Sequence, residues 1–288
     1  MKVSKLIFVS LLFGAFDIGL AAATEQTLTW TGCGISKKAF MKELAVEYEK
    51  RTGIAIRLSG GGATKGIRSV AAGNSDLGGS CRSWLRGVDG DIHPEEKDAE
   101  LIQVAWDALA VIVHPGNPVD DISLTDLKKV YEGTITNWKQ LGGFDKRIAL
   151  ITRDGKTSGV GHMFRKIVFG DPEFEFKARS LKVKSTGPLE SKVEKVVGAM
   201  AIDGISSARK RAVKVLSIDG VAPTKENVAS GAYSLFRPLY IAVNKKKMGK
   251  PAEDFVKFVL SDEGQAVISA QGTVNLKEGA ALEAMWKR

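Results

Sequence analysis

The chain has 288 residues, of which 42 are Lys or Arg and 33 are Asp or Glu, so its formal net charge is +9. Hydrophobic residues make up 44% of the sequence, while Gly and Pro number 31 and 8, a composition that excludes a disordered or fibrous protein. Two cysteines are too few for a disulfide-dense scaffold or a zinc ribbon, and three dispersed histidines give no metal-ligand pattern. HExxH, GxSxG and P-loop motifs are also missing from the sequence, so we expect neither an enzyme nor a bound cofactor or metal ion.

The first residues have the three parts of a secretory signal peptide. Lys2 and Lys5 are followed by a mostly apolar stretch at residues 6–20 and then by three alanines. Because that stretch is short for a membrane span, we expect a cleaved signal peptide at residues 1–23. The mature chain would then begin at Thr24, carry a formal charge of +8 and be a soluble periplasmic protein.

The hydrophobic pattern of the first 113 residues predicts strands that alternate with helices. Strands are expected at residues 27–31, 54–58, 75–81 and 101–113. The last of these segments is almost continuously apolar, which is typical of strands buried on both faces. One helix is expected to be capped by Ser36 and ended by Gly53, and another to contain Ile67 and Val70. This order indicates an α/β layered domain.

The segment His-Pro-Gly-Asn-Pro at residues 114–118 interrupts the pattern, after which strands and helices alternate again. Further strands are expected at residues 148–152, 199–202, 213–218 and 231–243. Helices are expected after Ser123, at residues 163–167, at residues 189–197 with Val193, Val196 and Val197 on one side, and near Phe255 and Ile268. His162 is expected on a helix surface. The length is about that of two domains, so two lobes with separate cores are expected.

Three turns share one design, in which a strand ends, small residues follow and a helix starts. They lie at residues 32–36, 60–64 and 157–161. Backbone N–H groups at a helix start are unpaired and carry partial positive charge, and glycines let the main chain approach a ligand, so such turns can hold an anion. Each turn taken singly is more often structural, so the expectation rests on the three together. The scattered basic residues fit attraction of a small anion and not nucleic-acid binding.

Several segments resemble the phosphate-binding proteins of phosphate ABC importers. They are residues 106–119, 124–127, 131–143 (YEGTITNWKQLGG), 219–224 and 233–240, together with Arg153 and the pair Ser158-Gly159. The resemblance implies a type II periplasmic-binding-protein fold, in which two α/β lobes joined by a two-strand hinge enclose a ligand cleft. It places residues 24–106 plus 236–288 in one lobe and residues 107–235 in the other. The implied function is capture of a tetrahedral oxyanion, phosphate first, for an ABC importer.

The same resemblance implies which residues would touch the anion. They are Cys33, Gly34, Ala63, Thr64, Cys81, Arg153, Ser158, Gly159 and Val160. Arg153 would be a bidentate donor, Ser158 a hydroxyl donor and Gly159 a backbone donor. The sequence departs from the family at Cys33, where a hydroxyl is usual, at Cys81, where a hydroxyl or carboxylate is usual, and at Val160, which replaces a threonine. The discrimination between phosphate and sulfate therefore stays open.

Three interpretations of Cys33 and Cys81 stay open. They could form a disulfide, as is usual in an exported protein, or they could be passive packing residues. They could also be free thiols that act as ligands or as a redox switch, which would fit a sensor-type receptor for arsenate or arsenite. Partners would then be either the membrane subunits of an importer or a sensor kinase, and the protein itself is expected to be monomeric. An exported phosphatase or an adhesion protein is a less favoured alternative.

Overall fold

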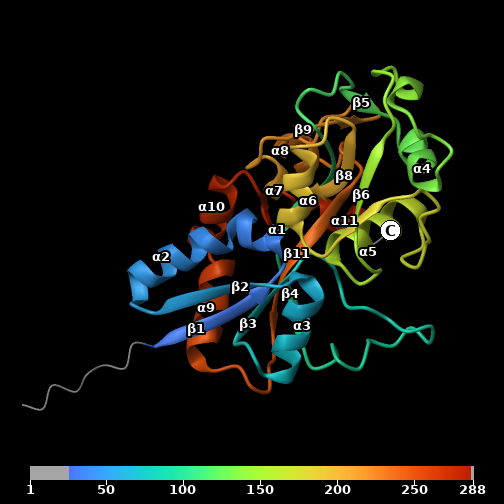
Figure 1. The fold of residues 1–288 in the computed structure, drawn as a ribbon. Helices are drawn as coiled ribbons and strands as arrows, with labels where there is room; N and C mark the ends of the chain where they lie inside the picture. Colours follow the sequence, from blue (N-terminus) through green and yellow to red (C-terminus); the bar gives the residue numbers. More distant parts are fainter. Residues whose placement is uncertain (1–25, 287–288) are drawn as a thin grey trace, which may run out of the picture.

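The computed structural model describes residues 26–286 of the chain (Figure 1). The signal peptide expected at residues 1–23 lies outside the described residues. Within the described part, no helix is both long and apolar enough to cross a membrane.

The core of the described residues is a ten-stranded sheet in which eight strands follow the order β2-β1-β3-β11-β4-β8-β6-β7, while β9 and β12 pair with β4. The strands of this sheet are β1 (Thr27–Gly32), β2 (Ala55–Gly60), β3 (Leu77–Ser80), β4 (Glu100–Val113), β6 (Ala149–Arg153), β7 (Leu181–Val183), β8 (Ala199–Gly204), β9 (Lys214–Val215), β11 (Phe236–Val243) and β12 (Val274–Asn275). A separate pair is formed by β5 (Asp121–Ile122) and β10 (Ser217–Ile218).

Two long strands, β4 and β11, connect the two halves of the sheet. β11 pairs with β4 and, on its other side, with β3, whereas the last five residues of β4 pair with β8. β4 is buried along most of its length, which explains why its sequence is one apolar run. The expected lobe boundary at Trp106 and Asp107 falls inside this strand, and it stays a prediction.

Helices cover both halves of the sheet (Figure 1). They are α1 (Gly34–Ser36), α2 (Lys42–Thr52), α3 (Gly62–Ala72), α4 (Leu124–Glu132), α5 (Gly159–Phe164), α6 (Thr186–Val193), α7 (Ile205–Ala208), α8 (Lys225–Ala229), α9 (Lys250–Leu260), α10 (Asp262–Ala270) and α11 (Ala280–Trp286). Two predicted boundaries are confirmed. Gly53 ends α2 with a φ of 72°, and the Ser123 side chain caps α4 by accepting from the backbone N–H of Asp126.

Several expected helix boundaries are wrong. The first helix begins after Cys33 and not after Ser36, because the Cys33 sulfur accepts from the Ser36 N–H and acts as the cap. α5 begins at Gly159, earlier than expected, because Ser158 caps it. π-helical turns join α1 to α2 (η1, Lys37–Met41) and extend α5 (η3, Arg165–Phe169), and a 3-10 turn lies at η2 (Trp138–Leu141).

Two expectations about exposure are also wrong. α6 ends at Val193, so Val196 and Val197 lie beyond it with exposed fractions of 42% and 40% instead of packing on one helix side. His162 lies within α5 and is only 7% exposed, so it is not a surface residue.

Candidate functional site

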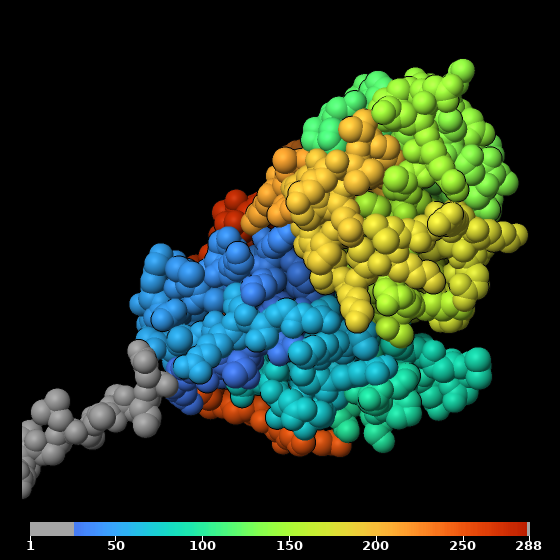
Figure 2. Space-filling model, viewed as in Figure 1, coloured from blue at the N-terminus to red at the C-terminus, as the bar shows by residue number. Residues whose placement is uncertain are grey.

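Four strand-to-helix turns surround a cavity of about 230 Å³. Three are the turns identified in the sequence, and the fourth connects β7 to α6. The lining residues are Cys33, Gly34, Ile35, Lys38, Gly60, Gly61, Gly62, Ala63, Cys81, Arg153, Gly159, Val160, Ser185, Thr186 and Gly187. Figure 2 shows the yellow segment, which includes α6, lying directly against the blue segment that includes α1. The cavity therefore lies between the two halves of the sheet.

The first turn places Cys33 beside Cys81. β1 and β3 are parallel neighbours in which Gly32 pairs with Gly79, so the residues that follow these strands emerge side by side. The Cys33 sulfur lies 3.3 Å from the backbone nitrogen of Ser36 and 3.1 Å from the Ser36 hydroxyl. A sulfur thus takes the place that an oxygen usually has at a helix cap.

The second turn depends on glycine. Gly61 and Gly62 have φ values of 151° and 90°, which side-chain-bearing residues rarely adopt. Gly61 is the N-cap of α3 and offers no side chain to the first N–H groups of this helix. These donors and the helix dipole are therefore available near the cavity wall, where Ala63 lies.

The third turn contributes the positive charge. Arg153 ends β6, and its Nη1 donates to the Thr186 hydroxyl at 3.1 Å while its Nη2 donates to the Lys184 carbonyl at 2.9 Å. Its Nε is buried without a hydrogen-bond partner. Burial lowers the pKa of Arg153, but a guanidinium stays charged at any physiological pH. The cavity wall thus contains a fixed cation with a donor to spare.

Two of the expected ligand hydroxyls do not line the cavity. The Thr64 hydroxyl donates to the Thr157 carbonyl at 2.8 Å and lies 3.0 Å from Nη2 of Arg82. The Ser158 hydroxyl accepts from the Gly161 N–H at 3.0 Å and so caps α5. The structure therefore places these two side chains in the framework around the cavity, whereas the other seven expected residues lie in its wall.

Arg82 is a residue of this framework that the sequence did not indicate. It is fully buried, and its Nη1 and Nη2 donate to Glu96 at 3.0 and 2.6 Å. Its Nε donates to the Thr157 carbonyl at 3.2 Å, and this bond joins the end of β3 to the turn after β6. Burial alone would raise the pKa of Glu96, but the hydrogen bonds and charge of Arg82 hold it below its usual value. No local pattern marks such a pair, because its partners are distant in sequence.

The fourth turn, Ser185-Thr186-Gly187, was also missed. It has the same signal as the other three, with hydroxyls and a glycine before a helix, and α6 begins there without a side-chain cap. Thr186 fixes Arg153 through the bond described above, and Lys38 on the facing wall donates to the buried Glu190 of α6 at 2.6 Å. The fourth turn thus completes the wall and orients its cation.

Both cysteines are buried free thiols in the structure, so the disulfide considered above is not present here. Burial favours the neutral form of Cys33, but hydrogen bonds from Cys81 and Ser36 and the charge of Arg237 together lower the pKa of Cys33 to about 7. The hydrogen bond between the two sulfurs and the burial of Cys81 both raise the pKa of Cys81. The two shifts run in opposite directions, so Cys33 is the sulfur of the pair that ionises first as the pH rises.

Gly159 brings the third turn into contact with the first half of the sheet. A Cβ atom at this position would lie 2.4 Å from the Cys81 sulfur and 3.0 Å from the Ala63 Cβ. Only a residue without a side chain allows this approach. The glycine of the third turn therefore permits close contact across the cavity.

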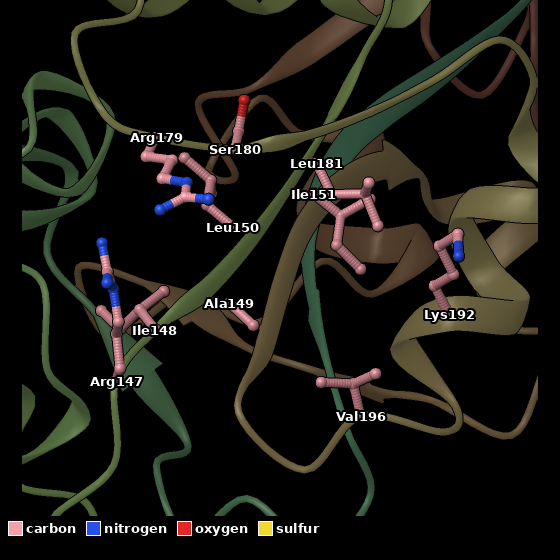
Figure 3. A pocket seen from close by; sticks show the side chains of 10 residues that line it. All are labelled: Arg147, Ile148, Ala149, Leu150, Ile151, Arg179, Ser180, Leu181, Lys192 and Val196. Atoms are coloured by element: carbon pink, nitrogen blue, oxygen red, sulfur yellow. The ribbon is translucent and has the colours of Figure 1, made fainter.

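A second pocket, of about 410 Å³, lies elsewhere, beside β6 and β7 (Figure 3). Arg147 and Arg179 lie at one end of it and Lys192 and Val196 on the other side. It contains none of the expected site residues and extends toward the amino end of β6, whereas Arg153 lies at the carboxyl end. Ligands of open α/β sheets bind at carboxyl ends, so the enclosed cavity is the candidate site.

Within residues 26–286, no group of three or more His, Cys, Asp or Glu side chains is arranged to hold a metal ion. The arrangement instead offers a cation and helix starts in an enclosed space, which suits binding of a small anion.

Comparison with known proteins identifies the family. The model of the PBP superfamily domain matches residues 21–263. The phosphate-binding protein PstS of Borreliella burgdorferi is 30% identical over 189 residues, which cover 63% of this chain and 68% of the relative. The protein of the same name from Bacillus subtilis is 29% identical over 255 residues, which cover 86% of this chain and 80% of the relative.

Solved structures agree with this assignment. A putative phosphate ABC transporter substrate-binding protein with bound phosphate, from Clostridium perfringens, is 28% identical with a TM-score of 0.75 and covers 87% of this chain and 99% of its own. An ABC-type phosphate transport receptor from Vibrio cholerae is 26% identical, with a TM-score of 0.64. The match covers 87% of this chain and 100% of the receptor chain. The chain therefore belongs to the PBP superfamily and, within it, to the PstS-like family, with the type II fold of two α/β lobes that the resemblance implied.

Proposed function

We propose that this protein is an exported receptor that captures phosphate in the enclosed cavity and delivers it to an ABC importer. The observation that carries the proposal is Arg153, a half-buried guanidinium whose Nε is buried without a partner, in the wall of a cavity where four helix starts meet. The names of the relatives, phosphate-binding protein and phosphate transport receptor, support phosphate as the anion.

The electrostatics of the wall favour a dianion. Arg153 and the uncapped starts of α3 and α6 supply positive charge and N–H donors around the cavity. The lining residues include no carboxylate, and Cys81 stands at the place where the family has a hydroxyl or carboxylate. At a pH below the pKa of Cys33 both thiols are neutral and no negative side chain lines the cavity, so we expect sulfate to compete with phosphate there.

Movement of the halves would admit the anion. We assign residues 24–106 plus 236–288 to one lobe and 107–235 to the other, with β4 and β11 as the hinge strands. The bonds from Thr64 and Arg82 to the Thr157 carbonyl would hold the lobes together in the closed state. Hinge closure around a ligand of this kind is typical of binding proteins. We expect a periplasmic monomer whose partners are the membrane subunits of the importer.

Calorimetry of the mature chain, residues 24–288, tests the proposal. We expect one phosphate per chain, competition by sulfate, and no turnover of a chromogenic phosphate ester. Arg153→Ala should weaken phosphate binding at least about 30-fold, because truncating one partner of a buried charge pair costs about 2–5 kcal/mol.

Arg147→Ala is the matched control, since it removes the same charge just before the other end of β6 and should leave the affinity unchanged. A folded Arg153→Ala variant that binds phosphate as tightly as the wild type would contradict the proposal. Circular dichroism establishes the fold of both variants.

A further inference from the structure

We infer that the cavity has a second ligand class: trivalent arsenic, taken up as arsenite and bonded to the sulfurs of Cys33 and Cys81. The inference does not depend on phosphate being the physiological anion, because the two thiols alone form the arsenic site. Arg153, which carries the proposed phosphate site, is not needed for it.

The first support is the placement of the thiols. The chain contains two cysteines, and both lie in the wall of one small cavity, after the neighbouring strands β1 and β3. Cys33 is 4% exposed and Cys81 is 1% exposed, and the two sulfurs interact with each other. A pair of adjacent thiols facing an enclosed space is a chelating group for a soft ligand.

The second support is the reactivity of the pair. A thiolate is the form of cysteine that attacks an electrophile and binds a soft centre. The Arg237 guanidinium donates to the Cys81 carbonyl at 3.3 Å, and Ser36 hydrogen-bonds to the Cys33 sulfur, so the surroundings stabilise negative charge on sulfur. These contacts lower the pKa of Cys33, which favours its thiolate form.

The third support is the number of protein ligands. Within the described residues, no third His, Cys, Asp or Glu joins the two cysteines to form a group that could hold a metal ion. An ion that requires three or four protein ligands is therefore not matched. Arsenite is matched, because its arsenic atom can form two bonds to sulfur and keep one hydroxyl group.

The reaction balances without an oxidant. Arsenite reaches the cavity as neutral As(OH)3, two S–H bonds and two As–O bonds break, two As–S bonds form, and two waters leave. The arsenic keeps its oxidation state. The cavity that the two cysteines line is also lined by the apolar side chains of Ile35, Ala63 and Val160, and the main chain of Gly159 lies close to the Cys81 sulfur. These groups accommodate a neutral soft ligand without leaving a buried charge unpaired.

Binding of sodium arsenite to the reduced mature chain, after the reductant has been removed, tests the inference. We expect one arsenic per chain by elemental analysis and the loss of both titratable thiols. Cys33→Ser and Cys81→Ser should each weaken binding about 100-fold or more, because the second bond of a chelate forms at high effective concentration. Arsenite-loaded protein should also lose phosphate binding, since both ligands would occupy the same cavity.

Arg153→Ala separates this inference from the proposed function. This variant should bind arsenite like the wild type while it loses phosphate, and the two serine variants should lose arsenite. Wild-type protein that binds phosphate but not arsenite overturns the inference alone, and protein that binds arsenite but not phosphate overturns the proposed function alone.

A test without substitutions covers the case in which a serine variant does not fold. Wild-type protein oxidised with diamide, which joins the two sulfurs, should bind no arsenite until it is reduced again. Equal arsenite binding by the oxidised and reduced forms, or by a folded serine variant and the wild type, refutes the two-sulfur site.

Discussion

Gly159→Ala should impair ligand binding by preventing closure of the cavity. Gly159 starts α5 on one side of the cavity, and the atoms that a new methyl group would meet belong to Cys81 and Ala63 on the other side. The backbone of Gly159 has no positive φ, so alanine is compatible with its local conformation. The effect of the substitution therefore comes from the contact across the cavity.

The size of the effect follows from two distances. The new Cβ would lie 2.4 Å from the Cys81 sulfur and 3.0 Å from the Ala63 Cβ, whereas ordinary contacts begin at 3.4 Å. The third turn must therefore retreat by about 1 Å, and overpacking of this kind costs about 1–3 kcal/mol. Because opening the cavity relieves the clash, the cost falls on the closed state. We expect binding about 5- to 150-fold weaker, with little change in the free energy of unfolding.

Phosphate calorimetry and urea unfolding of the variant measure the two quantities, and small-angle scattering reports closure. Gly187→Ala is the matched control: Gly187 also lines the cavity, but a Cβ there would meet nothing within 4 Å. This control should bind and close like the wild type. Unchanged phosphate affinity in a folded Gly159→Ala protein, or an equal loss in both variants, would refute the reasoning.

Two buried titratable groups give further predictions. Burial, followed by the charges of Arg82 and Lys166, lowers the pKa of His162 to about 4, so between this value and about 6.5 the unfolded chain binds the extra proton. Acidification from pH 7 to pH 4 should therefore lower the free energy of unfolding of the wild type by about 3 kcal/mol through His162. Urea unfolding of His162→Gln should show a smaller loss of stability over the same pH range. Equal losses in the variant and the wild type would contradict this prediction. Burial and the neighbouring Glu190 raise the pKa of Asp203 well above its usual value, so ionisation of Asp203 opposes folding as pH rises. Asp203→Asn should raise the melting temperature more at pH 8 than at pH 4. An equal rise at both pH values would show that ionisation of Asp203 does not destabilise the fold.

The turns that build the site were predictable because each is local. A strand end, glycines and a helix start are adjacent in sequence, and the apolar run of β4 and the glycine cap at Gly53 are equally local signals. The fourth turn was missed because the helix that follows it was expected to begin only at Leu189, after Gly187 and Pro188. In the structure both lie in the first turn of α6, where proline is tolerated because it lacks only an N–H that would have no partner.

Other features were not predictable from local patterns. Ser158 could have been a ligand donor or a helix cap, and only the position of the Gly161 N–H shows that it is the cap. The pairs Arg82–Glu96 and Asp107–Arg237 are fully buried, but their partners are distant in sequence and carry no spacing signal. The burial of His162 likewise depends on the start of α5, which the periodicity placed too late.

The position of β11 has a consequence for how the chain is made. Phe236–Val243 are synthesised late, yet they separate β3 from β4 and hydrogen-bond to both. Until these residues leave the ribosome, the facing edges of two earlier strands have no partner, and pairing of such remote segments is slow. The large sheet of this protein therefore cannot be completed before β11 is made, and the two unpaired edges are open to aggregation until then.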